Sequence, residues 1–446
     1  MMPIRIDRAI KPFGAAVGPL PYSGDHSECR RPSPTWISLL ALAIWLFSLA
    51  PTVHAQRIEG SAGNWRLTTQ HDTDAQGASD FLIRSVIGQI IVKGTNGSRI
   101  SVVEKITYHA NSEPVGLQRN RKGALSFVRS GNTIELVRLG EDEATHTAVY
   151  EVSVPARLLV HVDIASGNVE VADVQAEVQI ETGAGNVGLK NIQDRVSVRS
   201  GSGNIELSGV HQFASIHTGA GNVTALDLKS GIDVTTGGGN VTTRGVRGNV
   251  KVVTAGGALI VSDVSGNAIL FTSGGNISAT RVLGRLEASS SGGEIEALDI
   301  GGRTELSTNG GGIRAENISG SFRAETMAGD VVLKKMKFAF DIIAEVGNVS
   351  VFLDDASFLN SKDASIEGGY GNISIQLPKD VNGSISAIVT ESGSVVFNSP
   401  GSGAQITRER PSLRGEQVRK ASYSFGQGGG RISVSTRSGQ ITISQK

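Results

Sequence analysis

The segment TGAGNVGL, which runs from Thr182 to Leu189, contains a Gly-Asn pair that returns throughout the middle of the chain. Close variants begin at Ser200 (SGSGNIEL), Thr218 (TGAGNVTA) and Thr236 (TGGGNVTT). We take as a marker the glycine of each pair, or the glycine in the same place where Asn is replaced. The markers are 18 residues apart throughout, at Gly167, Gly185, Gly203, Gly221, Gly239, Gly257, Gly275, Gly293, Gly311, Gly329 and Gly347. A fixed period without insertions indicates a repeat protein.

Within each repeat the apolar residues follow a strand pattern. In the unit that starts at Gly185 they are Val187, Leu189, Ile192, Val196 and Val198. Spacing by two is the period of a β-strand, and no helical i, i+3, i+4 stripe accompanies it. Each repeat therefore predicts two short strands, and stacked repeats bury the apolar faces that a single repeat cannot. The predicted fold class is all-β, a single-stranded β-solenoid (β-helix) of 18-residue coils.

The handedness of the solenoid stays open. A left-handed hexapeptide β-helix needs an aliphatic residue every six positions. In this chain the second of those positions holds Gln193, His211, Lys229 or Arg247, which argues against that variant.

The Gly-Asn phrase itself has a structural interpretation. We expect the marker glycine to form a corner with positive φ, where neighbouring coils approach closely. The asparagines that follow the markers are expected to form a ladder in which each side chain bonds to the next coil. They are Asn168, Asn186, Asn204, Asn222, Asn240, Asn276 and Asn348. A second, hydroxyl ladder is expected from Thr182, Ser200, Thr218, Thr236, Thr254, Thr272, Ser290, Thr308 and Thr326.

The chain divides into four parts by composition and period. Residues 1–55 form a signal peptide with a long N-terminal arm, and residues 56–164 form a β-rich N-terminal region without the repeat period. Regular coils occupy residues 165–351. Residues 352–446 contain irregular coils, a charged loop at about 403–421 and a C-terminal cap.

The signal segment predicts export. An apolar run of 15 residues, Trp36 to Ala50, is too short for a stable membrane span and precedes Val53-His54-Ala55, which suits cleavage before Gln56. An uncleaved inner-membrane signal anchor is the alternative. In either case the bulk of the chain leaves the cytoplasm, to the periplasm or the cell surface.

Charge and cysteine usage narrow the partners. Without residues 1–55 the chain keeps 37 Lys and Arg against 39 Asp and Glu, a balance that favours neither nucleic acid nor an anionic membrane. The only cysteine, Cys29, lies in the signal segment, so disulfides do not stabilise the exported part.

The run YEVSVPARLLVHVDIASGNVEVADV, from Tyr150 to Val174, is followed by G-N-[VI]-x-[VL] units and ends in GGGRISVSTRSGQITI. These motifs, over roughly residues 85 to 445, resemble the bacterial putative-adhesin family of glycine/asparagine β-strand repeats. The resemblance implies an exported solenoid of undefined function, and the family name implies surface binding.

Candidate catalytic and metal sites are sparse. One outward column contains Glu287, Glu305, Arg323 and Asp341, with Glu325 beside it, and two carboxylates one strand step apart are a feature of retaining glycosidases. A solvated charge ladder is the simpler interpretation, since few aromatic residues are present to line a sugar groove. The histidines, which include His71, His109, His146, His161, His211 and His217, are scattered, so we expect no metal and no cofactor.

One departure from the outward polar pattern suggests a partner surface. Val253, Ile269 and Phe271 fall on neighbouring coils at positions that are otherwise polar, and stacked coils would join them into one apolar patch. The alternatives are a cover from another part of the chain or a local register shift.

These observations favour a non-enzymatic exported β-solenoid that acts as an adhesin-like binding or scaffolding module of the bacterial cell envelope. Its partner would be an envelope protein or a surface ligand, and its oligomeric state stays open. A periplasmic envelope-stress or regulatory component and a carbohydrate-active β-helix enzyme are the alternatives.

Overall fold

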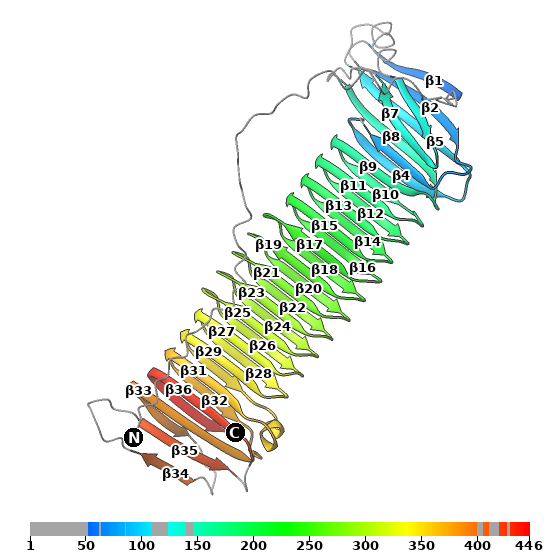
Figure 1. Cartoon of the computed structure of the whole chain (residues 1–446). Coiled ribbons are helices and arrows are strands. Elements are labelled where there is room, and N and C mark those ends of the chain that lie inside the picture. Colours follow the sequence, from blue (N-terminus) through cyan, green and yellow to red (C-terminus); the bar gives the residue numbers. More distant parts are fainter. Residues whose placement is uncertain are drawn as a thin grey trace, which may run out of the picture. The chain divides into compact units, whose positions relative to one another are not determined.

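The computed structural model describes residues 52–61, 64–84, 86–108, 124–139, 146–398, 405–409, 419–425 and 429–446. The predicted signal segment up to residue 51 lies outside this part. The chain is all-β, and the one helix of the described residues is a short 3-10 turn, η1 (Ser357–Asn360). The predicted β-solenoid is confirmed: successive coils stack in register and the strands of each coil pair with those of the next (Figure 1).

Each coil contributes one strand to each of two columns of parallel strands, which we call the odd column and the even column. In the regular part the odd column contains β9 (Leu159–Ser166), β11 (Val178–Ala184), β13 (Val196–Ser202), β15 (Ala214–Ala220), β17 (Ile232–Thr236), β19 (Val250–Thr254), β21 (Ala268–Thr272), β23 (Leu286–Ser290), β25 (Thr304–Thr308), β27 (Phe322–Ala328), β29 (Phe340–Val346) and β31 (Ala364–Tyr370). The even column contains β10 (Val169–Ala172), β12 (Val187–Ile192), β14 (Ile205–Val210), β16 (Val223–Leu228), β18 (Val241–Val246), β20 (Leu259–Val264), β22 (Ile277–Val282), β24 (Ile295–Ile300), β26 (Ile313–Ile318), β28 (Val331–Met336), β30 (Val349–Phe352) and β32 (Ile373–Leu377).

The core is a set of aliphatic columns enclosed between the two sheets. The five apolar residues predicted for the coil of Gly185 are all buried, with Val187 opposite Ile205 and Val196 opposite Ala214 in the next coil. Burial of each such side chain contributes about 1.5–3 kcal/mol. Because the same position recurs in every coil, the hydrophobic stabilisation accumulates along the stack.

The marker glycines lie where successive coils touch. A Cβ on Gly185 would lie 2.1 Å from the carbonyl oxygen of Gly167, and one on Gly275 would lie 2.0 Å from that of Gly257. Close approach therefore excludes a side chain at this corner. The expected positive φ is found at Gly167, Gly185, Gly203, Gly221, Gly329 and Gly347.

The positive φ prediction is wrong for the five markers between these two groups. Gly239, Gly257, Gly275, Gly293 and Gly311 have φ outside the left-handed range, and each follows a second glycine, as Gly275 follows Gly274. The preceding odd strands also end earlier there, at Thr272 rather than at a residue next to the marker. The doubled glycine thus accompanies a second type of corner.

Each asparagine after a marker bonds to the backbone of the next coil rather than to its amide. The Asn186 N–H donates to Oδ1 of Asn168 at 2.9 Å, and the Asn222 N–H donates to Oδ1 of Asn204 at 3.0 Å. The same bond is accepted by Asn186, Asn222, Asn240, Asn276 and Asn348. These bonds satisfy a corner N–H that has no strand partner.

The buried hydroxyls bond to backbone carbonyls. Thr182 donates within its own corner, to Ala184 O at 3.1 Å. In the doubled-glycine corners the hydroxyl bridges two coils: Thr272 donates to Gly257 O at 2.9 Å and accepts from the N–H of Gly275 at 3.1 Å. The hydroxyl column therefore reinforces the same contact that the marker glycine permits.

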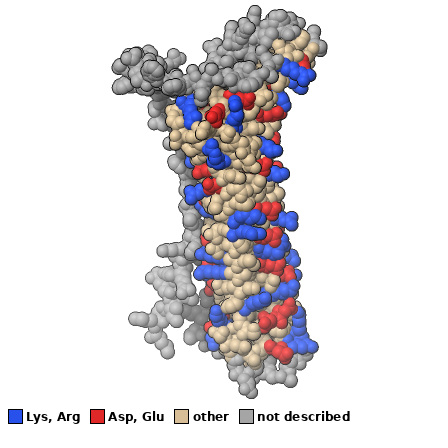
Figure 2. All heavy atoms as spheres, turned by 90° about the vertical axis from the view of Figure 1, so that its right-hand side faces the viewer, with Lys and Arg blue, Asp and Glu red and all other residues tan. Residues whose placement is uncertain are grey.

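A second corner, which the sequence analysis did not identify, lies at the end of each even strand from β10 to β28. Its residue has left-handed φ, for example 60° at Asp173 and 54° at Asn191, and in most coils it is Asp, Asn or Gly, which tolerate this conformation. The exceptions are Arg281 and Lys335. Arg281 donates to both carboxylate oxygens of Asp263 at 2.6 and 2.9 Å, and these hydrogen bonds lower the pKa of Asp263. On the side of the stack seen in Figure 2, acidic and basic residues are interspersed along the coils.

The stacked columns extend into the N-terminal region. β3 (Asp80–Arg84) pairs in parallel with β9, and β4 (Gln89–Thr95) pairs in parallel with β10, with Gly88 in the marker position beside Gly167. β7 (Thr133–Leu139) and β8 (His146–Pro155) form the next layer on β3 and β4. Antiparallel strands then close both columns: β6 (Ala124–Ser130) on β7, and β5 (Arg99–Tyr108), β2 (Asn64–Asp74) and β1 (Thr52–Ser61) in succession on β8.

A buried ionic cluster lies between these closing strands. Glu104 of β5 forms an ion pair with Arg138 of β7, and the Arg138 guanidinium also donates to the Tyr150 hydroxyl at 2.9 Å. His71 Nε2 lies 3.6 Å from the other Glu104 oxygen. All four side chains are buried, so the ionic partners compensate for one another's desolvation.

The C-terminal strands do not follow chain order in the stack. β36 (Arg431–Gln445) runs across both columns between β31 and β32 on one side and β33 (Gly383–Asn398) on the other. β35 (Arg419–Phe425) and β34 (Gln405–Glu409) continue antiparallel beyond β33. The flanks of the predicted charged loop are thus strands, and residues 410–418 lie outside the described part.

Two adjacent glycines test the contact between coils. Gly275→Ala places a methyl group against the Gly257 carbonyl and should destabilise the protein by about 2–3 kcal/mol. Gly274→Ala meets no atom within 4 Å and should change the free energy of unfolding by less than about 0.5 kcal/mol. Urea unfolding of both variants measures the difference, and equal losses would contradict the role assigned to the contact.

The asparagine ladder can be tested at Asn204, whose side chain serves the N–H of Asn222. Asn204→Ala removes that acceptor and should cost about 1 kcal/mol of unfolding free energy. Asn204→Asp keeps an acceptor oxygen and is the matched control. A loss in the aspartate variant as large as in the alanine variant would argue against the ladder bond as the cause.

Candidate functional site

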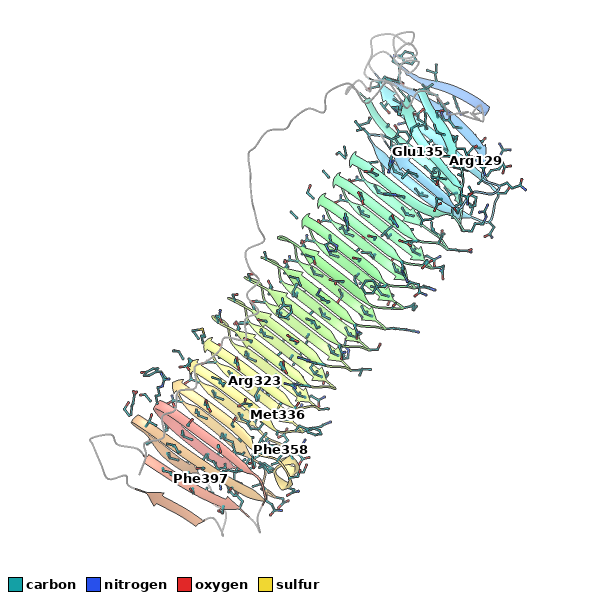
Figure 3. All side chains as sticks on the ribbon, in the orientation of Figure 1. Arg129, Glu135, Arg323, Met336, Phe358 and Phe397 are labelled. Atoms are coloured by element: carbon teal, nitrogen blue, oxygen red, sulfur yellow. The ribbon has the colours of Figure 1, made fainter. Side chains whose placement is uncertain are left out.

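The outward surface of the odd column, which we call the odd face, carries the features that the sequence analysis singled out as candidate sites. Along each odd strand, alternate side chains point to the core and to the outside. Because the coils stack in register, each outward position becomes a column of neighbouring side chains. Figure 3 shows side chains along the stack, including Arg323 on β27.

A shallow groove of about 650 Å³ lies on this face over β9 to β17. Its floor includes Gly183, Gly201 and Gly219, which leave the sheet backbone uncovered by side chains. We call it the upper groove. Glu181, Arg199 and His217 line it from one outward column, and the register places Arg199 directly between the other two.

These three side chains are exposed, and within the described part of the chain none of them forms a hydrogen bond or an ion pair. Asp163, next in the column, is held by Arg84 at 3.4 Å. A carboxylate, a guanidinium and an imidazole therefore stand in a row over the glycine floor. The hydrogen-bonding groups of these three side chains are therefore available to a ligand.

The column farther along the odd face is neutralised internally. Arg285 lies 2.9 Å from Glu287 and 3.1 Å from Glu305, and Arg303 also pairs with Glu305. Arg323 pairs with Glu325 and lies 2.6 Å from Asp341. A second groove, of about 420 Å³, includes Arg303, Arg323 and Asp341, which these pairs already engage.

The register brings the candidate catalytic carboxylates together but surrounds them with cations. Glu287 and Glu305 are direct neighbours on β23 and β25. A glycosidase of this kind needs one carboxyl in surroundings that hold a proton for the leaving group. Two arginines contact this pair instead, an arrangement that matches a stabilising charge ladder.

The three residues of the apolar patch also come together. Val253 and Phe271 are direct neighbours across β19 and β21, and Ile269 is two residues before Phe271 on the same face. All three are half-buried. The pairing of β19 with β21 is uninterrupted, so a register shift does not account for them.

The histidines are not brought together. His71 is buried beside Glu104, whereas His161 and His217 lie on β9 and β15 of the odd column; His109 and the His146 side chain are outside the described part. Over the described residues no group of three His, Cys, Asp or Glu side chains is placed to hold a metal ion. In that same part, no helix has both the length and the apolar character to cross a membrane.

Sequence reasoning did not identify the upper groove. The signal was present in the first glycine of TGAGN, SGSGN, TGAGN and TGGGN, which precedes the marker by two residues and falls at Gly183, Gly201, Gly219 and Gly237. A glycine at an outward strand position has no side chain, so it leaves the sheet backbone uncovered. The same phrase also forms the corner, which hides this second role in the sequence, and the charged column beside it becomes visible only when the coils are stacked.

Comparison with known proteins identifies no family. No family model matches the chain, and no curated protein does. Among solved structures, a putative cell adhesion protein from Clostridium sporogenes matches with 10% identity and a TM-score of 0.16, over 88% of this chain and 100% of its own. A putative adhesin from Parabacteroides distasonis matches with 9% identity and a TM-score of 0.25, over 64% and 96%.

A putative lipid binding protein from Parabacteroides distasonis matches with 11% identity and a TM-score of 0.23, over 63% of this chain and 96% of its own. At such identities and scores these likenesses carry no argument about what this chain binds.

The outward position of the apolar patch can be tested with two neighbouring residues of β21. Leu270 is fully buried, and Leu270→Asp places a carboxylate in the core at a cost of more than about 4 kcal/mol. Phe271→Asp should cost about 1 kcal/mol or less. Chemical denaturation compares the two, and a Phe271→Asp protein that does not fold would show that the patch belongs to the core.

Proposed function

We propose that the chain is an exported, non-enzymatic binding module of the bacterial cell envelope, of the adhesin-like kind, and that it presents its ligand site on the odd face. The observation that carries the proposal is the row of Glu181, Arg199 and His217 over the glycine floor of the upper groove. The charged residues of the column farther along this face, Glu287, Glu305, Arg323 and Asp341, are engaged in ion pairs, while these three have no partner among the described residues.

The scaffold suits binding because it holds this row rigidly. Residues on paired strands are positioned more firmly than residues on loops. Each coil of the groove is fixed to the next by parallel strand pairs, by the backbone contact at the marker glycine and by the asparagine bond. A ligand that spans several coils therefore meets groups whose spacing is set in advance, which lowers the entropy cost of binding.

The arrangement favours binding over catalysis. The only carboxylate pair that sequence reasoning offered for glycoside hydrolysis is engaged by arginines. The two carboxylates that line the upper groove, Glu181 and Asp163, are neighbours in one column, so neither lies on the opposite side of a bound chain from the other, and Arg84 lies 3.4 Å from that of Asp163.

Export rests on the apolar run and on the cleavage motif, which ends at Ala55. β1 begins at Thr52, so cleavage before Gln56 would remove the first residues of that strand and leave the part from Gln56 to Ser61 paired with β2. Trp65 and its neighbours on β2 would keep their pairing with β5. The fold is thus compatible with a mature chain that starts at Gln56.

The location can be measured in cells that produce the full chain. We expect N-terminal sequencing to find Gln56 first and external protease to degrade the protein on intact cells. Protection from protease, with release by osmotic shock, would place the protein in the periplasm and contradict surface binding. An uncleaved chain in the inner membrane would contradict the signal assignment.

A further inference from the structure

We propose that the upper groove binds an acidic polysaccharide, with a sugar carboxylate between Arg199 and His217 and sugar hydroxyls donating to Glu181. The inference rests on the proposed binding function and names its ligand class.

The row follows the direction in which the coils stack. Glu181, Arg199 and His217 occupy the same position on β11, β13 and β15 and are direct neighbours in register. With a strand spacing of about 4.8 Å, the row is about 10 Å long. A ligand that uses all three groups must therefore be extended along the stack, as a linear chain is.

The charge of the row favours an anion at one end and hydroxyl groups at the other. Arg199 presents several N–H donors in a fork that matches a carboxylate, and His217 adds a ring N–H one step away. Glu181 accepts hydrogen bonds but donates none while ionised. Asp163 does not repel the anion strongly, because Arg84 lies 3.4 Å from its carboxylate.

The groove is poorly suited to a peptide. Peptides bind sheets mainly by adding a strand to an open edge and by filling side-chain pockets. β11, β13 and β15 each have a strand on both sides, so the groove has no free edge. Its floor is glycine and its exposed side chains are polar, so it offers no apolar pocket.

The groove also lacks the means to hold a neutral sugar firmly. No Phe, Tyr or Trp lines it, so no aromatic face is available for stacking on a sugar ring. The affinity must then come from charge-assisted hydrogen bonds, each worth more than a neutral one. The glycine floor still allows a flat ring to lie close to the sheet.

The test uses the exported chain purified from cells, with oligogalacturonate as the probe and the fully methyl-esterified oligomer as its uncharged counterpart. Calorimetric titration at low salt should show binding of the acid and not of the ester, and the affinity should fall as salt is added. Arg199→Gln should weaken binding of the acid by about tenfold, the loss of one charge-assisted hydrogen bond. His217→Gln should weaken it in the same direction.

Lys190→Gln is the matched control. Lys190 is an exposed cation on β12, in the coil of Gly185 but on the even column, and it lies outside the groove lining. The same charge change there should leave the affinity within about twofold. Unfolding curves of all variants should coincide with that of the unchanged protein, because each altered side chain is exposed.

Three outcomes would overturn the inference. The ester could bind as well as the acid, or Lys190→Gln could lose as much affinity as Arg199→Gln, which would indicate attraction to overall charge. Polyglutamate could bind more tightly than the uronate and lose binding in Arg199→Gln, which would assign the groove to acidic peptides. If any of these results is obtained while the protein is accessible to protease on intact cells, the proposed ligand class is wrong and the proposed function is retained.

Discussion

The contact between the marker glycines of successive coils is the constraint on which the rest of the structure depends. At this corner the backbone of one coil lies against the carbonyl group of the previous one, so closely that a Cβ on Gly239 would lie 1.7 Å from Gly221 O. The coils can then keep parallel strand pairing on both sides of the corner. A larger residue would push one coil away and break the pairing on both columns. The asparagine and hydroxyl bonds stabilise this approach because they use the polar groups that the corner leaves unpaired.

Because the coils are stacked in register, residues at the same outward position of successive repeats form a line on the surface. When one outward position changes from Arg199 to Phe271 to Glu325 along the chain, the odd face changes from open charge to apolar to internally paired charge. The core is unaffected, since inward and outward residues alternate. The fold thus allows several surface chemistries to stand side by side on one rigid sheet. Because the outward residues are separate from the core, the upper groove keeps unpaired charged groups at little cost to stability.

The features that repeat were predictable from the sequence, and those that depend on a single long-range pairing were not. Val187 and Val196 are buried as their period indicates, because that pattern recurs in every coil. By contrast, β3 and β4 are separated from β9 by a long insertion, so their place in the stack shows only in the pairing of Val92 with Val171. The upper groove was missed for a related reason. Glu181 and Arg199 are 18 residues apart in sequence, and their adjacency is a property of the stack.

In both regions beyond the regular coils, the order of the strands gives the end of the stack a second neighbour, which a simple linear stack lacks. In a simple stack the terminal coil contacts one neighbour, so it opens more easily than the rest. Here β3 and β4 lie between β9 and β10 on one side and β7 and β8 on the other. β36 likewise lies between β31 and β32 on one side and β33 on the other. A strand held from both sides cannot leave until a neighbour does, so opening requires the loss of two layers together. The buried pair of Glu104 and Arg138 adds to this at one of the two regions, because separation of β5 from β7 would leave both charges without the partner that offsets their desolvation.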